Sequence, residues 1–152
     1  SGTENVAGAV AIATALELAE HDRATDAARV GAARDALIAG VLDTVPAARL
    51  TGHPHHRLPG AASFVFPGTS GEAVLLELER RGIVSSSGSA CAAGSDEPSH
   101  VLTAIGVDAD VARTAVRITL PHGFTAAIPP IVDAVAASVT ANRLGSVAPI
   151  RR

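Results

Sequence analysis

The only cysteine of this 152-residue chain, Cys91, lies in a run of small residues that extends from Ser85 to Ser95. A lone cysteine is often a small buried hydrophobic residue. Serine, glycine and alanine neighbours are instead typical of an exposed loop, in which a thiolate can act as a nucleophile. Glycines give such a loop the backbone freedom to move. We therefore predict a reactive thiol in a mobile loop that includes Ser87, Gly88, Ser89, Ala90 and Gly94.

Arg117 is the one charged residue in the alternating segment Thr114–Leu120. The alternation predicts a strand in which Val116, Ile118 and Leu120 form an apolar row and Arg117 points to the opposite face.

Three histidines, His53, His55 and His56, lie close together between Gly52 and Gly60. Histidine is a frequent metal ligand, but adjacent histidines beside prolines seldom converge on one ion. The chain also offers no pair of thiolates for a tetrahedral site. We therefore expect a loop here and no metal site.

The overall composition limits the class of protein. A net charge of −3 and an aromatic content of 2% argue against a nucleic-acid or anionic-membrane partner. No apolar run approaches the roughly 20 residues of a membrane span, and no signal-peptide pattern opens the chain. With one cysteine and therefore no internal disulfide, the expected setting is a reducing cytoplasm. All 12 basic residues are arginines, so this chain has no lysine with which to form a Schiff base.

The hydrophobic pattern predicts helices that alternate with short strands. A long helical pattern runs from Val10 to Leu42, with a cap at Thr3 or Asn5 and a polar block, His21–Asp26, that could interrupt it. Further helices are predicted over 72–81, 98–105 and 129–144, strands over 48–52, 61–66, 83–84 and 114–120, and a turn or short helix over 108–113. These elements predict one α/β or α+β sandwich, with helices packed on a small, mostly antiparallel sheet. Residues 146–152 are expected to form a flexible tail.

Four blocks of the sequence, in the same order and spacing, resemble the group I cysteine desulfurases of the NifS/IscS type. The block Ser85–Cys91, followed by Glu97–Leu102, resembles the catalytic loop of that family. The other blocks are Ser1–Val6, similar to the family's SGTxN segment; Thr51–Pro54 with Arg57–Pro59, similar to GHP…RLP; and Val116–Leu120, similar to xRFSLG. The resemblance covers about residues 1–144.

This resemblance implies a fold-type-I enzyme, a homodimer that depends on pyridoxal phosphate. Residues 1–145 would be its C-terminal portion, the small domain with a long connecting helix, and the Schiff-base lysine would precede them. The implied activity converts L-cysteine to L-alanine. The sulfur would pass, as a persulfide, to an acceptor or scaffold protein that serves iron–sulfur cluster assembly or thiolation.

The resemblance also implies roles for individual residues. Cys91 would be the nucleophile that takes the sulfur. Arg117 would bind the substrate carboxylate, since a guanidinium can make two parallel hydrogen bonds to it; the alternative is a surface charge on the strand. Thr3 would contact the cofactor phosphate of the partner subunit, with a plain helix cap as the alternative. His100 follows the loop and could tune the thiol, although we expect it to have a packing role.

Two positions depart from the family pattern. The family often has asparagine where this chain has Gly60, and the segment after Leu120 is one residue longer, reading Pro121-His122-Gly123 and lacking the family's arginine. Two alternatives remain open at this stage. One is another class V aminotransferase relative, such as a selenocysteine lyase. The other is a catalytically silent domain, because the isolated chain has no lysine.

Overall fold

The structure is a computed structural model that describes residues 2–87 and 97–143. Its helices and strands, in chain order, are α1 (Val6–Thr44), β1 (Arg49–Leu50), β2 (Ala61–Val65), α2 (Gly71–Arg80), β3 (Ser86–Ser87), α3 (His100–Ala104), α4 (Ala109–Ala112), β4 (Ala115–Thr119) and α5 (Pro129–Ala141). The strands form one sheet in the order β1-β2-β4-β3, and every pair of neighbours is antiparallel. This confirms the predicted class, helices packed on a small antiparallel sheet.

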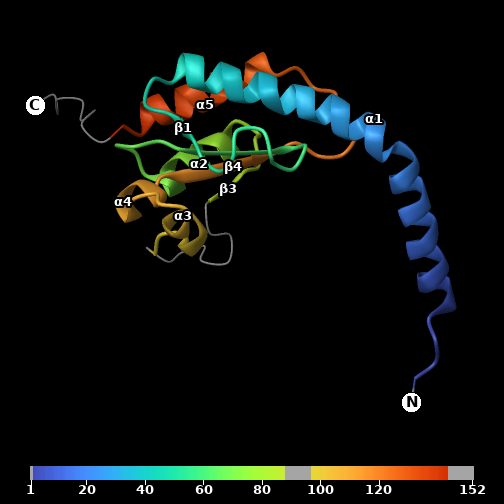
Figure 1. Cartoon of the computed structure of the whole chain (residues 1–152). Coiled ribbons are helices and arrows are strands. Elements are labelled where there is room, and N and C mark those ends of the chain that lie inside the picture. Colours follow the sequence, from blue (N-terminus) through green and yellow to red (C-terminus); the bar gives the residue numbers. More distant parts are fainter. Residues whose placement is uncertain (1, 88–96, 144–152) are drawn as a thin grey trace, which may run out of the picture.

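The face of the sheet toward α1 and α5 (Figure 1) carries the main hydrophobic core. Phe64 of β2 and Val116 of β4 point to this face, and both are fully buried beneath α1, α2 and α5. Phe64 stacks on Phe66 with ring centroids 6.0 Å apart, so two of the three phenylalanines fill the centre. The helices pack closely because Gly40 of α1 lies against Val132 of α5, where a Cβ would come within 2.7 Å of that side chain.

The opposite face of the sheet is covered only in part. A second cluster joins Val65 and Ala115 of the sheet to Leu102 of α3 and Ala112 of α4. Beyond this cluster the same face carries Ser63, Arg117 and Thr119, which are half-buried or exposed. The sheet therefore has one closed face and one face that is open where Arg117 lies.

Helix α1 is longer and more regular than the sequence predicts. It begins after Asn5, whose side-chain oxygen accepts a hydrogen bond from the Gly8 amide at 2.9 Å, so Asn5 and not Thr3 is the cap. The polar block His21–Asp26 does not interrupt it, and Arg23 forms an exposed ion pair with Glu20 one turn earlier. Figure 1 shows that the first half of α1 projects away from the rest of the molecule.

Most other boundaries agree with the sequence-based predictions, with two corrections. The predicted buried strand Ile83–Val84 is wrong, since the strand is Ser86–Ser87 and Val84 is 86% exposed. Gly82 turns the chain after α2 with a φ of 77°, which moves pairing with β4 three residues downstream. Helix α5 ends at Ala141 and not at residue 144.

Among the described residues, no helix combines the length and apolar character that a membrane crossing needs.

Candidate functional site

Arg117 lies in the middle of β4 on the open face of the sheet, as the alternation predicts. Its register partners are Ser63 of β2 on one side and Ser86 of β3 on the other. Within the described part of the chain, no ion pair or side-chain hydrogen bond engages the Arg117 guanidinium. A charged fork flanked by two small hydroxyl side chains can accept a carboxylate without first breaking an internal pair.

The serine on one side of Arg117 is held by a hydrogen-bonded neighbour. Thr51 follows β1 and is 7% exposed. Its Oγ1 lies 2.8 Å from Ser63 Oγ and 3.1 Å from the Ser63 carbonyl oxygen. The end of β1 thus fixes the Ser63 hydroxyl beside Arg117.

Arg57 fastens the long connection between β1 and β2. Its guanidinium donates to the carbonyl oxygens of Thr51 at 3.0 Å, His53 at 2.8 Å and Ala61 at 3.3 Å. Burial lowers the pKa of Arg57 below its ordinary value, and the nearby positive charge of Arg34 lowers it further. Arg57 holds the strands on either side of the loop in place, a role that no periodicity or motif in the sequence indicated.

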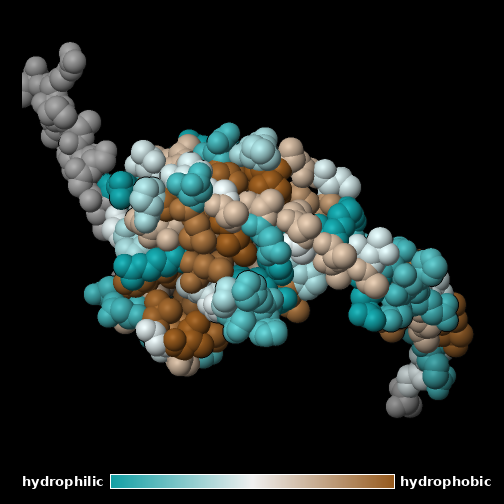
Figure 2. Space-filling model, turned by 45° about the horizontal axis from the view of Figure 1, so that its top comes forward, coloured by the Kyte–Doolittle hydropathy of each residue, from teal (hydrophilic) through white to brown (hydrophobic). Residues whose placement is uncertain are grey.

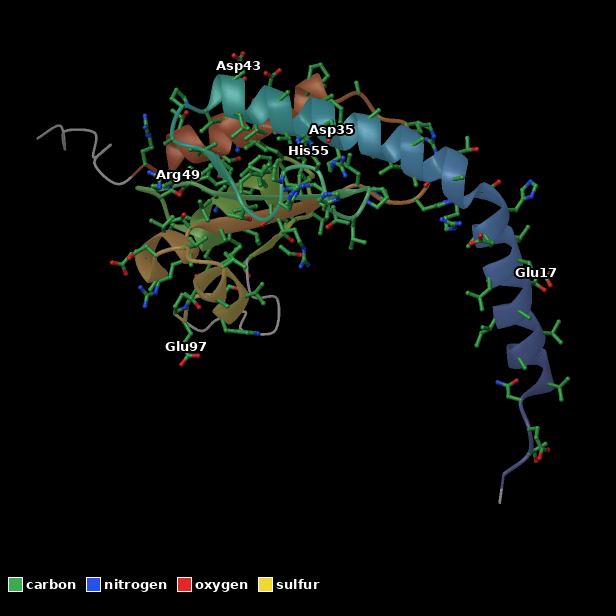
Figure 3. All side chains as sticks on the ribbon, viewed as in Figure 1. Glu17, Asp35, Asp43, Arg49, His55 and Glu97 are labelled. Carbon is green, nitrogen blue, oxygen red and sulfur yellow. The ribbon has the colours of Figure 1, made fainter. Side chains whose placement is uncertain are left out.

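The first of the three histidines in this loop forms hydrogen bonds with the backbone of the other two. His53 Nδ1 accepts hydrogen bonds from the backbone amides of His55 at 3.0 Å and His56 at 2.9 Å. The lone pair of His53 Nδ1 therefore stabilises the turn formed by residues 53–56. Among the described residues, no group of three or more histidine, cysteine, aspartate or glutamate side chains could hold a metal ion. Figure 3 shows His55 in the loop below α1.

The proposed nucleophile and most of its loop lie outside the described residues. These are Cys91, Gly88, Ser89, Ala90 and Gly94. Ser87, which the sequence groups with that loop, is the last residue of β3 and pairs with Val116. His100 is the first residue of α3 and is exposed, so it does not pack within the described domain, and a packing role elsewhere stays a prediction.

Thr3 precedes α1 and is exposed at the far end of the projecting half of the helix. It does not cap the helix, since Asn5 does. Its hydroxyl can therefore contact a group outside the described residues, and the alternative of a plain cap is excluded.

The donor set suits contacts to pyridoxal phosphate and its substrate, but not covalent attachment of the cofactor. Arg117 offers a guanidinium and Thr3 a hydroxyl, while the chain contains no amine side chain to form a Schiff base. Among the described residues, one surface cleft of about 640 Å³ lies between β1 and the α3–α4 region, and another of about 370 Å³ lies beside α1. Arg117 lines neither cleft. Arg117 itself is exposed.

The two departures from the family pattern are neighbours in space. Gly60 accepts a hydrogen bond from the Leu120 amide at 2.9 Å, and a Cβ at Gly60 would lie 2.2 Å from the Leu120 carbonyl oxygen. The longer segment that follows Leu120 docks on α1, where Asp26 accepts from the Gly123 amide at 3.1 Å. Gly60 is thus in direct contact with Leu120, the residue after which the longer segment begins.

Comparison with known proteins agrees with this arrangement. Residues 1–127 match the class-V aminotransferase family. The chain is 43% identical over 141 residues to a cysteine desulfurase of Cereibacter sphaeroides, which covers 88% of this chain and 36% of that protein. It is 46% identical over 123 residues to the IscS-like cysteine desulfurase of Mycobacterium tuberculosis, covering 80% of this chain and 31% of that protein.

A solved structure shares the fold. The NifS-like protein of Rickettsia africae superposes with a TM-score of 0.71 at 26% identity, over 91% of this chain and 34% of that one. The chain therefore spans about one third of the length of the relatives it matches. With a family match over most of its length and relatives above 40% identity, the chain belongs to the class-V aminotransferase family.

Proposed function

We propose that this chain is the sulfur-accepting portion of a pyridoxal-phosphate-dependent cysteine desulfurase. The observation that carries the proposal is the position of Arg117 on the open sheet face, one strand away from the segment that leads to the only cysteine. The names of the relatives from Cereibacter sphaeroides and Mycobacterium tuberculosis support the same activity. No comparison favours a selenocysteine lyase.

The covalent chain limits how far Cys91 can lie from the arginine. Ser86 pairs with Arg117 and Ser87 with Val116. Cys91 follows Ser87 by four residues, a span of at most about 14 Å when fully extended. This tether supports a role in which the thiol reaches a substrate bound at Arg117 and also swings outward to an acceptor protein.

In the proposed reaction, Arg117 binds the carboxylate of L-cysteine and so fixes the direction of its side chain. The Cys91 thiolate attacks the substrate sulfur, forming a sulfur–sulfur bond while the carbon–sulfur bond breaks. The electron pair of the broken bond stays with the carbon, which takes up a proton and becomes the methyl group of L-alanine. Pyridoxal phosphate, when bound, supplies the electron sink that makes this cleavage feasible.

Other parts of the active enzyme must come from outside residues 1–152. The chain has no lysine, so the amine that holds the cofactor belongs to another segment or chain. We propose that Thr3 contacts the cofactor phosphate across a homodimer interface. The persulfide on Cys91 would then pass to a sulfur-acceptor or scaffold protein.

A hybrid enzyme tests the proposal. In it, this chain replaces the matched third of the Mycobacterium tuberculosis relative, and alanine and sulfide formation from cysteine are measured. Cys91→Ala should abolish sulfide release while the cofactor absorbance stays unchanged. Loss of the absorbance as well, or full activity without the thiol, would contradict the assigned role.

The arginine has its own test and control. Arg117→Lys removes the bidentate fork but keeps the charge, and the loss of one charge-assisted hydrogen bond should raise KM for cysteine about tenfold or more. Arg113→Lys is the matched control, because Arg113 is an exposed arginine that pairs with Asp110 at the end of α4. An unchanged KM in Arg117→Lys, or an equal rise in both variants, would remove Arg117 from the substrate site.

A further inference from the structure

Four polar residues form one row across the open face of the sheet. Thr51 lies beside Ser63 of β2, because its amide donates to the Ser63 carbonyl oxygen at 2.9 Å. Ser63 lies opposite Arg117 of β4, and Arg117 lies opposite Ser86 of β3. Residues opposed in this way point to the same face of a sheet. Apolar side chains are common on the surface of this molecule, as Figure 2 shows, so the composition of the chain does not by itself explain an entirely polar row.

Backbone pairing decides which serine is closer to the arginine. In an antiparallel sheet, each residue directs its amide and its carbonyl group to the same neighbouring strand. Those of Ser63 point toward β1, since the Ser63 carbonyl accepts from Thr51. Ser63 and Arg117 therefore form a pair without backbone hydrogen bonds, in which opposed Cα atoms are about 4.5 Å apart, whereas Arg117 and Ser86 form a hydrogen-bonded pair with a separation of about 5.5 Å. The Ser63 side chain thus lies closer to that of Arg117 than the Ser86 side chain does.

The Thr51 hydroxyl can donate to the Ser63 hydroxyl without leaving another group unpaired. Thr51 Oγ1 lies 2.8 Å from Ser63 Oγ and 3.1 Å from the Ser63 carbonyl oxygen. That carbonyl oxygen already accepts from the Thr51 amide, and a hydroxyl has only one proton to donate. Among residues 2–87 and 97–143, Thr51 is the only hydrogen-bond partner of Ser63 Oγ. When the Thr51 proton is on Ser63 Oγ, the proton of Ser63 is therefore left for a further acceptor.

Thr51 is held in place by its surroundings. It is 7% exposed, and Arg57 donates to its carbonyl oxygen at 3.0 Å. The hydrogen bond of its amide to β2 fixes the other side of the same residue. A group that is oriented before the ligand arrives loses little conformational entropy on binding.

The donors on this face fit a group that only accepts hydrogen bonds. Arg117 presents N–H donors, and Ser63 presents one O–H donor when Thr51 donates to it. A carboxylate can accept from both, whereas a carboxamide brings its own N–H groups against these donors. Hydrogen bonds in a chain also polarise and strengthen one another. The row is therefore suited to a free carboxylate and not to the amide of a peptide bond.

We propose that Thr51 and Ser63 form a hydroxyl relay to the substrate. Ser63 donates a hydrogen bond to the carboxylate held by Arg117. Thr51 is a positioning residue, which donates to Ser63 and so keeps the Ser63 proton directed at the substrate. The relay makes the site selective for amino acids with a free carboxylate over those in which an amide blocks it. The inference rests on the proposed function, since it takes Arg117 as the carboxylate-binding residue.

Binding of the proposed product tests the contact from Ser63. The Kd values of L-alanine and L-alaninamide are measured by titration calorimetry on the hybrid enzyme and its variants. L-Alanine has no sulfur, so the measurement does not depend on sulfur transfer. Ser63→Ala should weaken L-alanine about tenfold or more, because a hydrogen bond to a charged group is lost, and should change L-alaninamide by less than about twofold. An equal loss for both ligands, or no loss for L-alanine, would overturn the contact.

Variants of Thr51 test the relay itself. Thr51→Val should weaken L-alanine about threefold or more, and Thr51→Ser, which keeps the hydroxyl, should stay within about twofold of the unsubstituted hybrid. Because Thr51 acts through Ser63, Thr51→Val should have no further effect when it is added to Ser63→Ala. The control is Thr69→Val, which removes another buried hydroxyl, 2.7 Å from the Phe66 carbonyl oxygen, and should leave the L-alanine Kd unchanged. Additive losses in the double variant, or equal losses in Thr51→Val and Thr51→Ser, would contradict the relay.

The same measurements separate the relay from the proposed sulfur transfer. L-Alanine binding that depends on Ser63 and Thr51, in a hybrid that releases no sulfide from cysteine, would support the relay and refute only sulfur transfer. L-Alanine binding that weakens in Arg117→Lys but not in Ser63→Ala or Thr51→Val would refute only the relay.

Discussion

The close approach of Gly60 to Leu120 gives the most direct test of how the sheet and the altered loop fit together. In Gly60→Ala, the new Cβ would lie 2.2 Å from the Leu120 carbonyl oxygen and 3.2 Å from its carbonyl carbon. An ordinary carbon–oxygen contact is about 3.3 Å or longer, so the two backbones must separate by about 1 Å. Since both contact atoms belong to the backbone, no rotamer change relieves the overlap.

Two contributions make up the expected loss of stability in Gly60→Ala. Overpacking of this kind costs about 1–3 kcal/mol. Separation of the strands also weakens the hydrogen bond from the Leu120 amide to the Gly60 carbonyl, 2.9 Å long, which contributes about 0.5–1.5 kcal/mol. We expect the free energy of unfolding to fall by about 2–4 kcal/mol. If this free energy decreases by about 2 kcal/mol per molar urea, the urea midpoint falls by about 1–2 M.

A matched glycine provides the control. Gly31 lies within α1, and the nearest atom to a Cβ there is Arg34 Nη2 at 4.0 Å. Gly31→Ala should stabilise the chain by about 0.5–1 kcal/mol, because alanine loses less backbone entropy in a helix. Urea unfolding followed by circular dichroism measures both variants. A Gly60→Ala midpoint within error of the unsubstituted chain would refute the reasoning, as would a loss of similar size in Gly31→Ala.

Two further predictions concern arginine side chains. Arg57→Met should lower the free energy of unfolding by about 2–3 kcal/mol, because three backbone carbonyls lose a charged donor. Arg80 is exposed, so the control variant Arg80→Met should cost less than about 0.5 kcal/mol. Equal urea midpoints in the two variants would contradict the prediction. Carbon-detected NMR should find the pKa of Glu77 below its ordinary value, chiefly because of its hydrogen bond with Arg81. That depression stabilises the fold above the ordinary pKa, and the contribution disappears as pH falls through the folded-state pKa. A Glu77 pKa unchanged by Arg81→Ala would refute this cause.

Local patterns were sufficient to predict most elements of the fold. The alternation of 114–120 placed Arg117 opposite the apolar row, and the structure confirms that orientation. The prolines at 129 and 130 predicted the start of a helix, which begins there. Each of these features depends on residues within one or two turns or a single strand, so neighbours in the sequence determine them.

Local sequence patterns gave wrong predictions where contacts between residues far apart in the chain determine the structure. The strand after α2 is Ser86–Ser87 and not Ile83–Val84, since pairing with β4 overrides the apolar character of the earlier residues. The polar block in α1 remains helical because the second half is anchored on the core. Arg57 and Thr51 lie in a block that resembles the family, but their supporting role was missed, because their partners are backbone and hydroxyl groups that leave no pattern in the sequence.

The sequence by itself determined the chemistry that this chain can offer: one thiol, the guanidinium of Arg117 and no lysine. These are statements about residue types, and no folding can change them. Only the tertiary structure decided that Arg117 lies between Ser63 and Ser86 on an uncovered face, and that Gly60 makes room for the backbone of Leu120. Both depend on the register of strands far apart in the chain, which is fixed by the burial of Phe64 and Val116 on the opposite face.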